Sequence, residues 1–313
     1  MKNLKEKLDF LKTMLKIRGF EQKIDELFSK GLLGGTCHLC IGQEASAVGI
    51  ISQLKKGDKV VSSHRGHGHA IAMGCDLSRL FGELLEKEIG YCKGRGGTQH
   101  ICASEKGFYG TNGITGGGIP IATGLALAAK RDKKKQVIVS MFGDGAVNQG
   151  TFHESLNMAA IWNLPIVYVC ENNLYAMSMH IDKAVKIKEL HKRSESYRIQ
   201  GEVVDGTDVE AIARIAEKAI ARARENQGPT LLETKSYRYK GHSKSDSRVY
   251  RTRQEEDEWL KKDCISKFET VLGKEGQKDR ISQIKSLLAK EINKSFEIAN
   301  QSKFAEDYYS GVR

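Results

Sequence analysis

An acid and an amide that follow two apolar segments are the side chains with the clearest chemistry in this chain. Asp144 follows the apolar run of residues 136–142, and Asn173 follows the run of residues 165–170. Carboxylate and amide oxygens are ligands that Mg²⁺ prefers, and a bound Mg²⁺ can hold a diphosphate. The Gly-Asp-Gly sequence around Asp144 can also be no more than a turn that ends a strand. The asparagine at the matching place after a second apolar run favours the ion site.

The two apolar runs must be neighbouring strands if these side chains are to meet. Both runs are short and contain β-branched residues, a pattern typical of a parallel sheet that is covered on both faces. Residues 151–162 between them are predicted to form a helix, which gives a β-α-β crossover. Ligands of open α/β sheets collect at the carboxyl ends of the strands, where Asp144 and Asn173 both stand. Gly143 and Gly145 allow a tight turn there, and the helix that follows is expected to direct its amino end at the anion.

The rest of the chain extends the same fold class, an α/β fold with a parallel sheet and helices on both faces. Helices are expected at about residues 4–31, 43–53, 120–130, 207–224, 253–272 and 280–299, and strands at residues 60–62 and 230–234. Pro120 suits the first turn of its helix, and Asp208 can cap the start of another. With only three prolines and no low-complexity linker, residues 1–313 are expected to form one domain with a C-terminal helical extension.

Charge and composition indicate an ordinary globular protein. The chain has 40% hydrophobic and 28% charged residues and a net charge of +11, but its basic residues are scattered among 39 acids and few aromatics lie near them. We interpret them as a solvated surface and expect no binding of nucleic acid. The densest basic cluster, residues 130–135, is explained by a helix end and an exposed turn. A docking surface for an acidic partner domain is the alternative.

The cysteines and the apolar segments of the sequence indicate in which cellular compartment the protein is expected. Seven cysteines at irregular spacing do not indicate a disulfide framework, so the cytoplasm is the expected compartment. Cys37 and Cys40 form a single Cys-x-x-Cys sequence, and core packing is favoured over a redox or zinc pair. No stretch approaches the length of a membrane span, and the amino-terminal residues start an amphipathic pattern, so no membrane or targeting segment is expected.

Histidines and glycine-rich loops offer two further kinds of site. His64, His67 and His69 resemble a metal cluster, but no nearby carboxylate completes a zinc spacing, and zinc is therefore not expected. The glycine-rich residues 93–97 and 115–118 do not follow strands with Gly-x-Gly-x-x-Gly spacing, so a nicotinamide site of the Rossmann type is also not expected.

Sequence blocks along most of the chain resemble the α subunit of the thiamine diphosphate-dependent component of 2-oxo acid and acetoin dehydrogenase complexes. The matching blocks occur in order between residue 18 and about residue 253. They are residues 37–40, 42–44, 64–69, 94–97, 113–120, 143–175, 204–206 and 237–243. The resemblance implies the thiamine diphosphate-binding fold, with thiamine diphosphate and Mg²⁺ as cofactors.

The resemblance also implies roles for individual residues. Asp144, the side-chain oxygen of Asn173 and the backbone carbonyl of Tyr175 are expected to ligate Mg²⁺. Contacts to the cofactor phosphates are expected from Gly145, Ala146, Arg65, His64 and His242. Gly113 and Thr115 are expected to hold the aminopyrimidine ring through backbone groups.

His242 is the leading catalytic histidine, because it lies in a block that resembles the mobile active-site loop of the family. His38 is the second, and a purely structural role is an equal alternative. Ser243 matches a serine that is phosphorylated in some relatives, although capping of a loop explains it as well. Gln99 and Ala176 depart from the family pattern, where methionine and glycine are common. Both departures concern the substrate channel and leave the expected ion site intact.

The resemblance implies that the protein cleaves acetoin or decarboxylates pyruvate, forms a hydroxyethyl adduct on the cofactor, and passes the two-carbon unit to the lipoyl group of a partner acyltransferase. Residues 64–69 and 241–246 look more like acetoin than mammalian-type pyruvate dehydrogenases, so acetoin is the leading substrate. No segment resembles the domain with the glutamate that activates the cofactor ring, which the family places in a β subunit. An α2β2 tetramer is therefore expected. The alternative from another class is a noncatalytic basic scaffold or nucleic-acid-binding protein with a relic cofactor fold.

Overall fold

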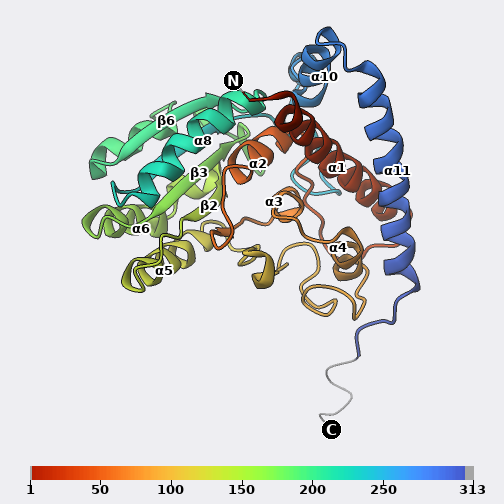
Figure 1. Cartoon of the computed structure of the whole chain (residues 1–313), viewed down its shortest axis with the longest axis horizontal. Helices are drawn as coiled ribbons and strands as arrows, with labels where there is room; N and C mark the ends of the chain where they lie inside the picture. Colours follow the sequence, from red (N-terminus) through yellow and green to blue (C-terminus); the bar gives the residue numbers. More distant parts are fainter. Residues whose placement is uncertain (1, 307–313) are drawn as a thin grey trace.

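Five parallel strands form the central sheet of the protein (Figure 1). The computed structural model describes residues 2–306, so the ends of the expected domain of residues 1–313 lie outside the described residues. The strands lie in the order β1-β2-β3-β7-β6. They are β1 (Lys59–Val61), β2 (Ile138–Gly143), β3 (Ile166–Asn172), β6 (Gln200–Asp205) and β7 (Thr230–Lys235). The four predicted strands are confirmed, whereas β6 was not predicted.

Helices cover both faces of this sheet, as the apolar strands predict. Along β2, Ile138 packs in a core cluster with residues of α5 (Gly118–Arg131) and α6 (Gly150–Ile161). The next residue, Val139, packs in a second cluster with residues of α2 (Glu44–Ile51) and α8 (Val209–Arg224). Successive side chains of a strand point to opposite faces, so a continuous apolar strand supplies two cores at once.

Five further helices contribute buried side chains to the second core. They are α1 (Leu4–Ser29), α3 (His67–Ala72), α4 (Leu77–Leu84), α10 (Cys264–Lys274) and α11 (Lys278–Gln301). Figure 1 shows the long helices α1 and α11 side by side at one edge of the molecule. Gly19 permits this approach, because a Cβ atom there would lie 2.5 Å from Cδ1 of Ile292. The C-terminal helices thus cover the amino-terminal helix of the same chain.

The single helix expected over residues 253–272 is wrong. The segment forms α9 (Arg253–Leu260) and α10, which are separated by three residues. Asp263 starts α10, since its side chain accepts a hydrogen bond of 3.0 Å from the backbone of Ser266. The same carboxylate pairs with Arg18 of α1 at 2.8 Å, so the break is fixed by a cap and by a contact to a distant helix.

Several short elements complete the described structure. They are β4 (Tyr175–Ala176), β5 (Met179–His180), α7 (Ile181–Ala184) and 3₁₀ turns at Ser104–Lys106, Asp144–Asn148 and Leu190–Tyr197. All seven cysteines are unpaired, which agrees with the absence of a predicted disulfide framework, and Cys37 and Cys40 lie in the core as expected. Among residues 2–306, no helix has the length and apolar character needed to cross a membrane.

Candidate active site

Asp144 and Asn173 lie at the carboxyl ends of two paired strands, as the sequence predicts. Gly143 at the end of β2 pairs in register with Glu171 of β3, and Asp144 and Asn173 follow within two residues of that pair. Both side chains are buried, and both residues line one cavity of about 270 Å³. The topology therefore brings the two proposed ion ligands to one place.

A short turn connects β2 to α6 and carries Asp144. Asp144–Asn148 form a 3₁₀ turn, and α6 spans Gly150–Ile161, so the helix predicted over residues 151–162 is confirmed. The glycines also serve another purpose, since Gly143 has an ordinary negative φ of −86°. A Cβ atom at Gly145 would lie 2.8 Å from the Cβ atom of Ala176. Gly145 therefore allows β4 to approach the turn closely.

Four buried polar atoms in the residues that line this cavity have no hydrogen-bond partner. They are Nε2 of Gln43, Nε2 of His64, Oδ2 of Asp144 and Oε1 of Glu171. A buried polar atom without a partner costs free energy, so such atoms are uncommon and call for an explanation. Carboxylate oxygens and nitrogen atoms around one cavity fit a ligand that contains both a cation and polar or anionic groups. The residues present thus fit a diphosphate bound with Mg²⁺.

The charged form of Asp144 is unfavourable in this buried environment. Burial raises its pKa to about 6, although backbone hydrogen bonds and the positive charges of Arg238 and Arg65 act in the opposite direction. Burial disfavours the charged form of a carboxyl group, and a cation bound to the carboxylate would favour it. The site is therefore built so that a metal ion would relieve the cost of the buried charge.

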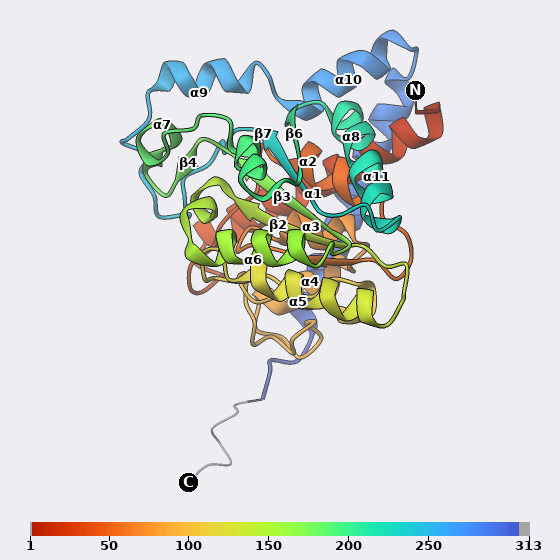
Figure 2. The ribbon, with the colours of Figure 1, turned by 90° about the vertical axis from the view of Figure 1, so that its left-hand side faces the viewer.

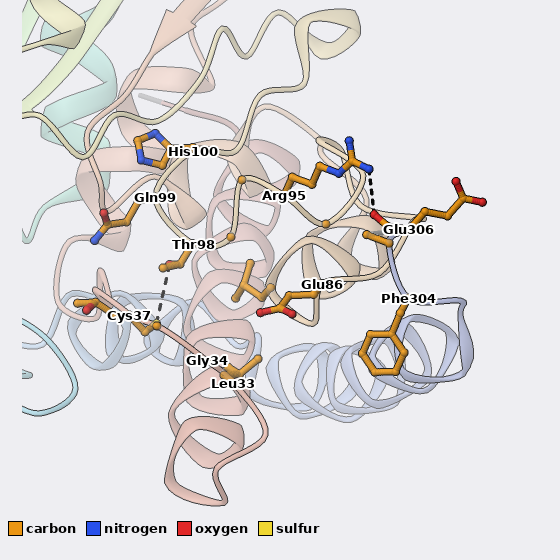
Figure 3. A pocket seen from close by; sticks show the side chains of 17 residues that line it. Leu33, Gly34, Cys37, Glu86, Arg95, Thr98, Gln99, His100, Phe304 and Glu306 are labelled. Atoms are coloured by element: carbon orange, nitrogen blue, oxygen red, sulfur yellow. Dashed lines mark hydrogen bonds between the residues drawn. The ribbon is translucent and has the colours of Figure 1, made fainter. Parts of the chain in front are cut away.

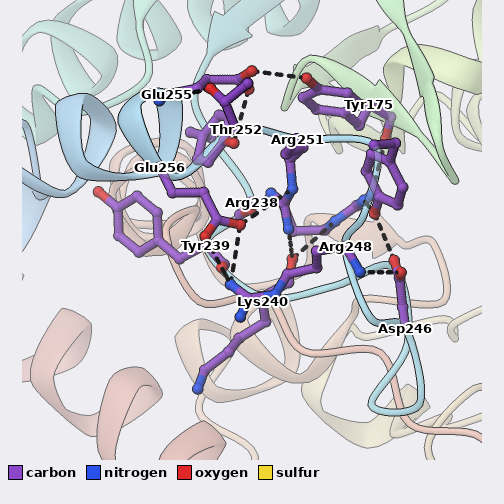
Figure 4. A network of polar contacts seen from close by, with 12 residues as sticks. Tyr175, Arg238, Tyr239, Lys240, Asp246, Arg248, Arg251, Thr252, Glu255 and Glu256 are labelled. Atoms are coloured by element: carbon purple, nitrogen blue, oxygen red, sulfur yellow. Dashed lines mark hydrogen bonds and ion pairs between the residues drawn. The ribbon is translucent and has the colours of Figure 1, made fainter.

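The backbone carbonyl of Tyr175, the third expected metal ligand, accepts a hydrogen bond from Arg238. Nη1 of Arg238 donates to this carbonyl at 2.9 Å, and Nη2 donates to Tyr250 Oη at 2.9 Å. Figure 4 shows this guanidinium inside a network that also contains Asp246 and Arg251. Arg238 is almost fully buried and lines the cavity. It connects β4 to the loop that carries His242.

Arg65 lies in the wall of the same cavity and is almost fully buried. Its Nη1 atom donates to the carbonyl of Leu39 at 2.8 Å, and its Nη2 atom donates to the carbonyl of His242 at 2.7 Å. Burial and the nearby Arg238 lower its pKa to about 9, so the group still carries a positive charge at neutral pH. Arg65 can thus offer charge to an anion in the cavity while it holds two wall segments.

His38, His64 and His242 come together beside this cavity. Their ring centroids are 4.8 Å apart for His38 and His64 and 4.9 Å apart for His38 and His242. His64 and His242 line the cavity, whereas His38 packs against both rings. Burial, together with Arg65, lowers the pKa of His38 to about 3 and that of His242 to about 4. All three rings are therefore neutral at physiological pH, since the pKa of His64 is lowered as well.

This cluster is the one group of three or more metal-capable His, Cys, Asp or Glu side chains found among residues 2–306. Its nitrogen atoms lie within 4.8 Å of one another. A transition metal is nevertheless a poor fit, because Nη2 of Arg65 lies 3.2 Å from Nδ1 of His242 and a guanidinium can only donate. That nitrogen is occupied, and the positive charges of Arg65 and Arg238 oppose a further cation.

The other two histidines of the 64–69 block have different surroundings. Nδ1 of His67 lies 2.8 Å from Glu21 Oε1, and its Nε2 lies 2.7 Å from Thr98 Oγ1. His69 contacts Ser62 and Glu171. Neither His67 nor His69 lines the cavity, so of the three histidines in this block only His64 does. They lie on α3, a helix that was not predicted.

Only one of the two residues expected at the aminopyrimidine ring lines the cavity. Thr115, like Gly145 and Ala146, lines the cavity, whereas Gly113 does not. A Cβ atom at Gly113 would lie 2.9 Å from Oε1 of Gln99. In this structure Gly113 therefore makes room for a neighbouring amide instead of forming the cavity wall.

The cavity residues that were not predicted include the buried polar residues Gln43, Glu171 and Arg238. Each lies inside a block that carries the family resemblance, yet none was given a role. A buried polar residue next to an expected ligand was the available signal: Glu171 precedes the Asn-Asn pair, and Nδ2 of Asn173 donates to Gln43 at 3.2 Å.

A larger cavity lies elsewhere, between the glycine-rich residues 94–97 and the C-terminal segment (Figure 3). It has a volume of about 1120 Å³ and is lined by Cys37, Arg95, His100 and Phe304 among others. None of the four unpartnered cavity atoms belongs to it. Size alone therefore does not identify the functional site.

The chain belongs to the dehydrogenase E1 component family, whose model matches residues 12–307. It is 46% identical to the α subunit of acetoin:2,6-dichlorophenolindophenol oxidoreductase of Bacillus subtilis, over 94% of this chain and 89% of the relative. The corresponding subunit of Cupriavidus necator is 45% identical over 83% of this chain and 79% of the relative. The pyruvate dehydrogenase E1 component α subunit of Rhizobium meliloti is 44% identical, over 77% and 70%.

These matches confirm the family that the sequence blocks indicate. The family is thiamine diphosphate-dependent, and the chain is accordingly an α subunit of an oxidoreductase, which implies a β subunit as its partner. The alternative of a noncatalytic basic scaffold or nucleic-acid-binding protein is not favoured.

Proposed function

We propose that this chain is the α subunit of a thiamine diphosphate-dependent enzyme that cleaves acetoin and passes the two-carbon unit to a lipoyl group. Two relatives with 46% and 45% sequence identity to this chain over the aligned residues are named for acetoin. The observation that carries the proposal is the convergence of four unpartnered polar atoms on the cavity where Asp144 and Asn173 meet.

The cofactor site is proposed to contain Mg²⁺ held by Asp144, Asn173 and the carbonyl of Tyr175. Because Arg238 already donates to that carbonyl, metal and guanidinium would share the two lone pairs of one oxygen. The cofactor phosphates would meet the positive charge of Arg65 and the backbone of Gly145 and of the residues near it. The polar groups of this chain thus bind and orient the anionic end of the cofactor.

Bound thiamine diphosphate supplies an electron sink for the carbanion left when a bond beside a carbonyl carbon breaks. The histidine cluster lies beside the same cavity and is neutral at physiological pH, so its rings can donate or accept a proton at the substrate oxygens. We assign this role to His242 first and to His38 second. His64 lines the cavity, and its unpartnered Nε2 atom is suited to a cofactor or substrate contact.

We further propose an α2β2 tetramer in which the β subunit contributes the glutamate that activates the cofactor ring. The outer sides of α5 and α6 support this assembly, since they lie next to each other on one side of the molecule (Figure 2). They expose Ile121, Met158, Ile161 and Trp162. Large exposed apolar residues are candidates for an interaction surface. A lipoyl-bearing acyltransferase is the proposed acceptor partner, the cytoplasm is the proposed compartment, and residues 1–313 are proposed to form one domain.

The test is reduction of an artificial dye by the complex of this chain with its β subunit, in the presence of thiamine diphosphate and Mg²⁺. Acetoin is expected to give a higher kcat/KM than pyruvate at equal enzyme concentration. A clear preference for pyruvate would instead assign the reaction of the Rhizobium meliloti relative and leave the cofactor site unchanged. Turnover that does not depend on added cofactor would contradict the proposed site.

A further inference from the structure

Gln99 contacts one edge of the His38 ring. Its Nε2 atom lies 2.9 Å from Nδ1 of His38. The same ring packs edge to face against His64 and His242, with interplanar angles of 77° in both cases. His38 is therefore enclosed between the amide of Gln99 and the two histidines that line the cavity, while Gln99 itself does not line that cavity.

The backbone that carries Gln99 is held firmly on both sides. The buried carboxylate of Glu83 accepts hydrogen bonds from the backbone N–H groups of Gly94 at 3.1 Å and Gly96 at 2.5 Å. Thr98 contacts His67 at 2.7 Å, and the N–H group of His100 donates to the carbonyl of Gly96 at 3.1 Å. A side chain on such a support keeps a fixed position, which is what orienting another residue requires.

The amide of Gln99 is also confined from the opposite side. Oε1 lies 2.9 Å from the point where a Cβ atom of Gly113 would stand. Any side chain larger than that of glycine at this position would displace the amide. Gly113 therefore preserves the space in which Gln99 reaches His38.

The contact decides where the proton of His38 lies. An amide nitrogen only donates hydrogen bonds, so Nδ1 of His38 must accept. The ring is neutral at physiological pH because burial and the charges of Arg65 and Arg238, with the neighbouring His242 and His67, lower its pKa. A neutral imidazole carries a single N–H group, and this group is consequently at Nε2.

We propose that Gln99 is a positioning residue that fixes His38 with its proton on Nε2, so that His38 presents an N–H group, and not a lone pair, within the histidine cluster at the cavity. Arg65 acts in the same way on His242, because a guanidinium next to Nδ1 also leaves the proton on Nε2. The N–H group of His242 can then be donated to an oxygen of a substrate such as an α-hydroxyketone, with the N–H group of His38 in the ring packed behind it. This inference rests on the proposed function for the identity of the reaction, and on the contact between Gln99 and a neutral His38 ring for the position of the proton.

The position of the proton is tested by nitrogen–proton NMR of the histidine side chains in the isotope-labelled full chain. His38→Asn identifies the signals of His38. The wild-type chain is expected to show Nε2 protonated and Nδ1 unprotonated. In Gln99→Glu the carboxylate can only accept, and the proton is expected to move to Nδ1. A proton on Nδ1 in the wild-type chain would overturn the proposal.

The consequence for catalysis is tested in the complex with the β subunit. Gln99→Met keeps the length of the side chain but removes the donor, and kcat for acetoin is expected to fall about tenfold, the effect of one lost hydrogen bond of a catalytic group. KM is expected to change much less, because Gln99 does not contact the substrate. In Gln99→Glu the acid limb of the pH profile is expected to move up by about one pH unit, since a carboxylate favours the protonated ring.

The matched control is Gln254→Met, which changes an exposed glutamine that bonds only to Glu258 on its own helix. Its kcat and pH profile are expected to equal those of the wild-type enzyme. Equal kcat in Gln99→Met and Gln254→Met would contradict the positioning role. If the wild-type complex turned over neither acetoin nor pyruvate, the proposed function would fall, and the NMR result would still decide whether Gln99 fixes the proton of His38.

Discussion

Arg65 donates from one guanidinium nitrogen toward both the carbonyl oxygen and Nδ1 of His242, at 2.7 and 3.2 Å. The two residues are 177 positions apart in the sequence, and they follow strands that are not neighbours, β1 and β7. Through a second nitrogen, Arg65 also holds the carbonyl of Leu39. One buried cation thus joins three segments that form the wall of the candidate active site.

Arg65→Gln is expected to loosen this wall and to weaken cofactor binding. The change removes the charge that faces the cavity and at least one of the bonds to His242. Hydrogen bonds that involve a charged group contribute about 1.5–3 kcal/mol each, so the affinity for thiamine diphosphate with Mg²⁺ is expected to fall by about ten- to a hundredfold. Calorimetry on the complex measures this fall.

Limited digestion with trypsin gives a second measurement for the same variant. Lys240 and Lys244 lie on either side of His242, and cleavage there is expected to be faster in Arg65→Gln than in the wild-type chain. Arg214→Gln, which changes an exposed arginine on α8, is the control. Equal affinity and equal cleavage in the two variants would rule out the proposed role of Arg65.

Glu83→Gln is expected to destabilise the chain. The carboxylate is completely buried and accepts from Cys92, Gly94 and Gly96 with both of its oxygens. An amide would place N–H₂ against one of these donors and remove the charge that strengthens the other bonds. The free energy of unfolding is therefore expected to fall by about 2 kcal/mol.

Urea denaturation of the full chain measures the effect. Glu86→Gln makes the same chemical change at an exposed residue three positions later, and its free energy of unfolding is expected to stay within about 0.5 kcal/mol of the wild-type value. A Glu83→Gln chain as stable as Glu86→Gln would show that the glycine-rich loop does not depend on this acid.

The strands next to the cavity could be predicted because their burial leaves a simple pattern. β2 and β3 are mainly apolar and stand on either side of one helix, which implies a parallel pair with Asp144 and Asn173 at the same edge. β6 offers no such pattern, since it lies at the edge of the sheet and Val204 is its one buried residue. Local sequence cannot distinguish such a strand from a loop.

The arrangement of side chains around the cavity could be predicted only in part. His38, His64 and His242 come from three distant segments, and their contact depends on how α2, β1 and β7 pack, which no local pattern encodes. The break at Asp263 was missed for a similar reason, because the acid that caps α10 also pairs with Arg18 of α1. The family resemblance supplied the cavity residues, but it did not indicate that Gly113 would face Gln99.

Asp144→Asn is expected to change stability and binding in opposite directions. Burial raises the pKa of Asp144 to about 6, above its value of 3.8 in a model peptide. The folded chain therefore holds its proton more tightly than the unfolded chain, so the charge of Asp144 lowers the stability of the metal-free chain above pH 6. This cost is relieved as the pH falls from 6 towards 4. An uncharged asparagine removes it, and at pH 7.5 the metal-free variant is expected to be more stable by about 2 kcal/mol.

Thermal unfolding at pH 7.5 and pH 5, without metal or cofactor, measures this effect. The gain from Asp144→Asn is expected to be about half as large at pH 5 as at pH 7.5. Calorimetry is expected to find that the variant has lost Mg²⁺-dependent binding of thiamine diphosphate, and that wild-type binding weakens below pH 6 as Asp144 is protonated. Retention of Mg²⁺-dependent binding by the variant would eliminate Asp144 as a metal ligand.

Ile161→Asp is expected to prevent assembly with the β subunit without unfolding this chain. Ile161 is 70% exposed at the end of α6, beside Met158 and Trp162, so an acid there meets water in the free chain but would lie in an apolar contact in the tetramer. A buried unpaired charge costs several kcal/mol, which is enough to dissociate most interfaces.

Leu287→Asp is the matched control, since Leu287 is 66% exposed on α11, at the other side of the molecule in Figure 1. Light scattering after gel filtration is expected to find a tetramer for the control and a free chain for Ile161→Asp, with dye reduction lost only in the latter. Full turnover by this chain without any partner would contradict the assembly itself, and a tetramer formed by Ile161→Asp would place the interface elsewhere.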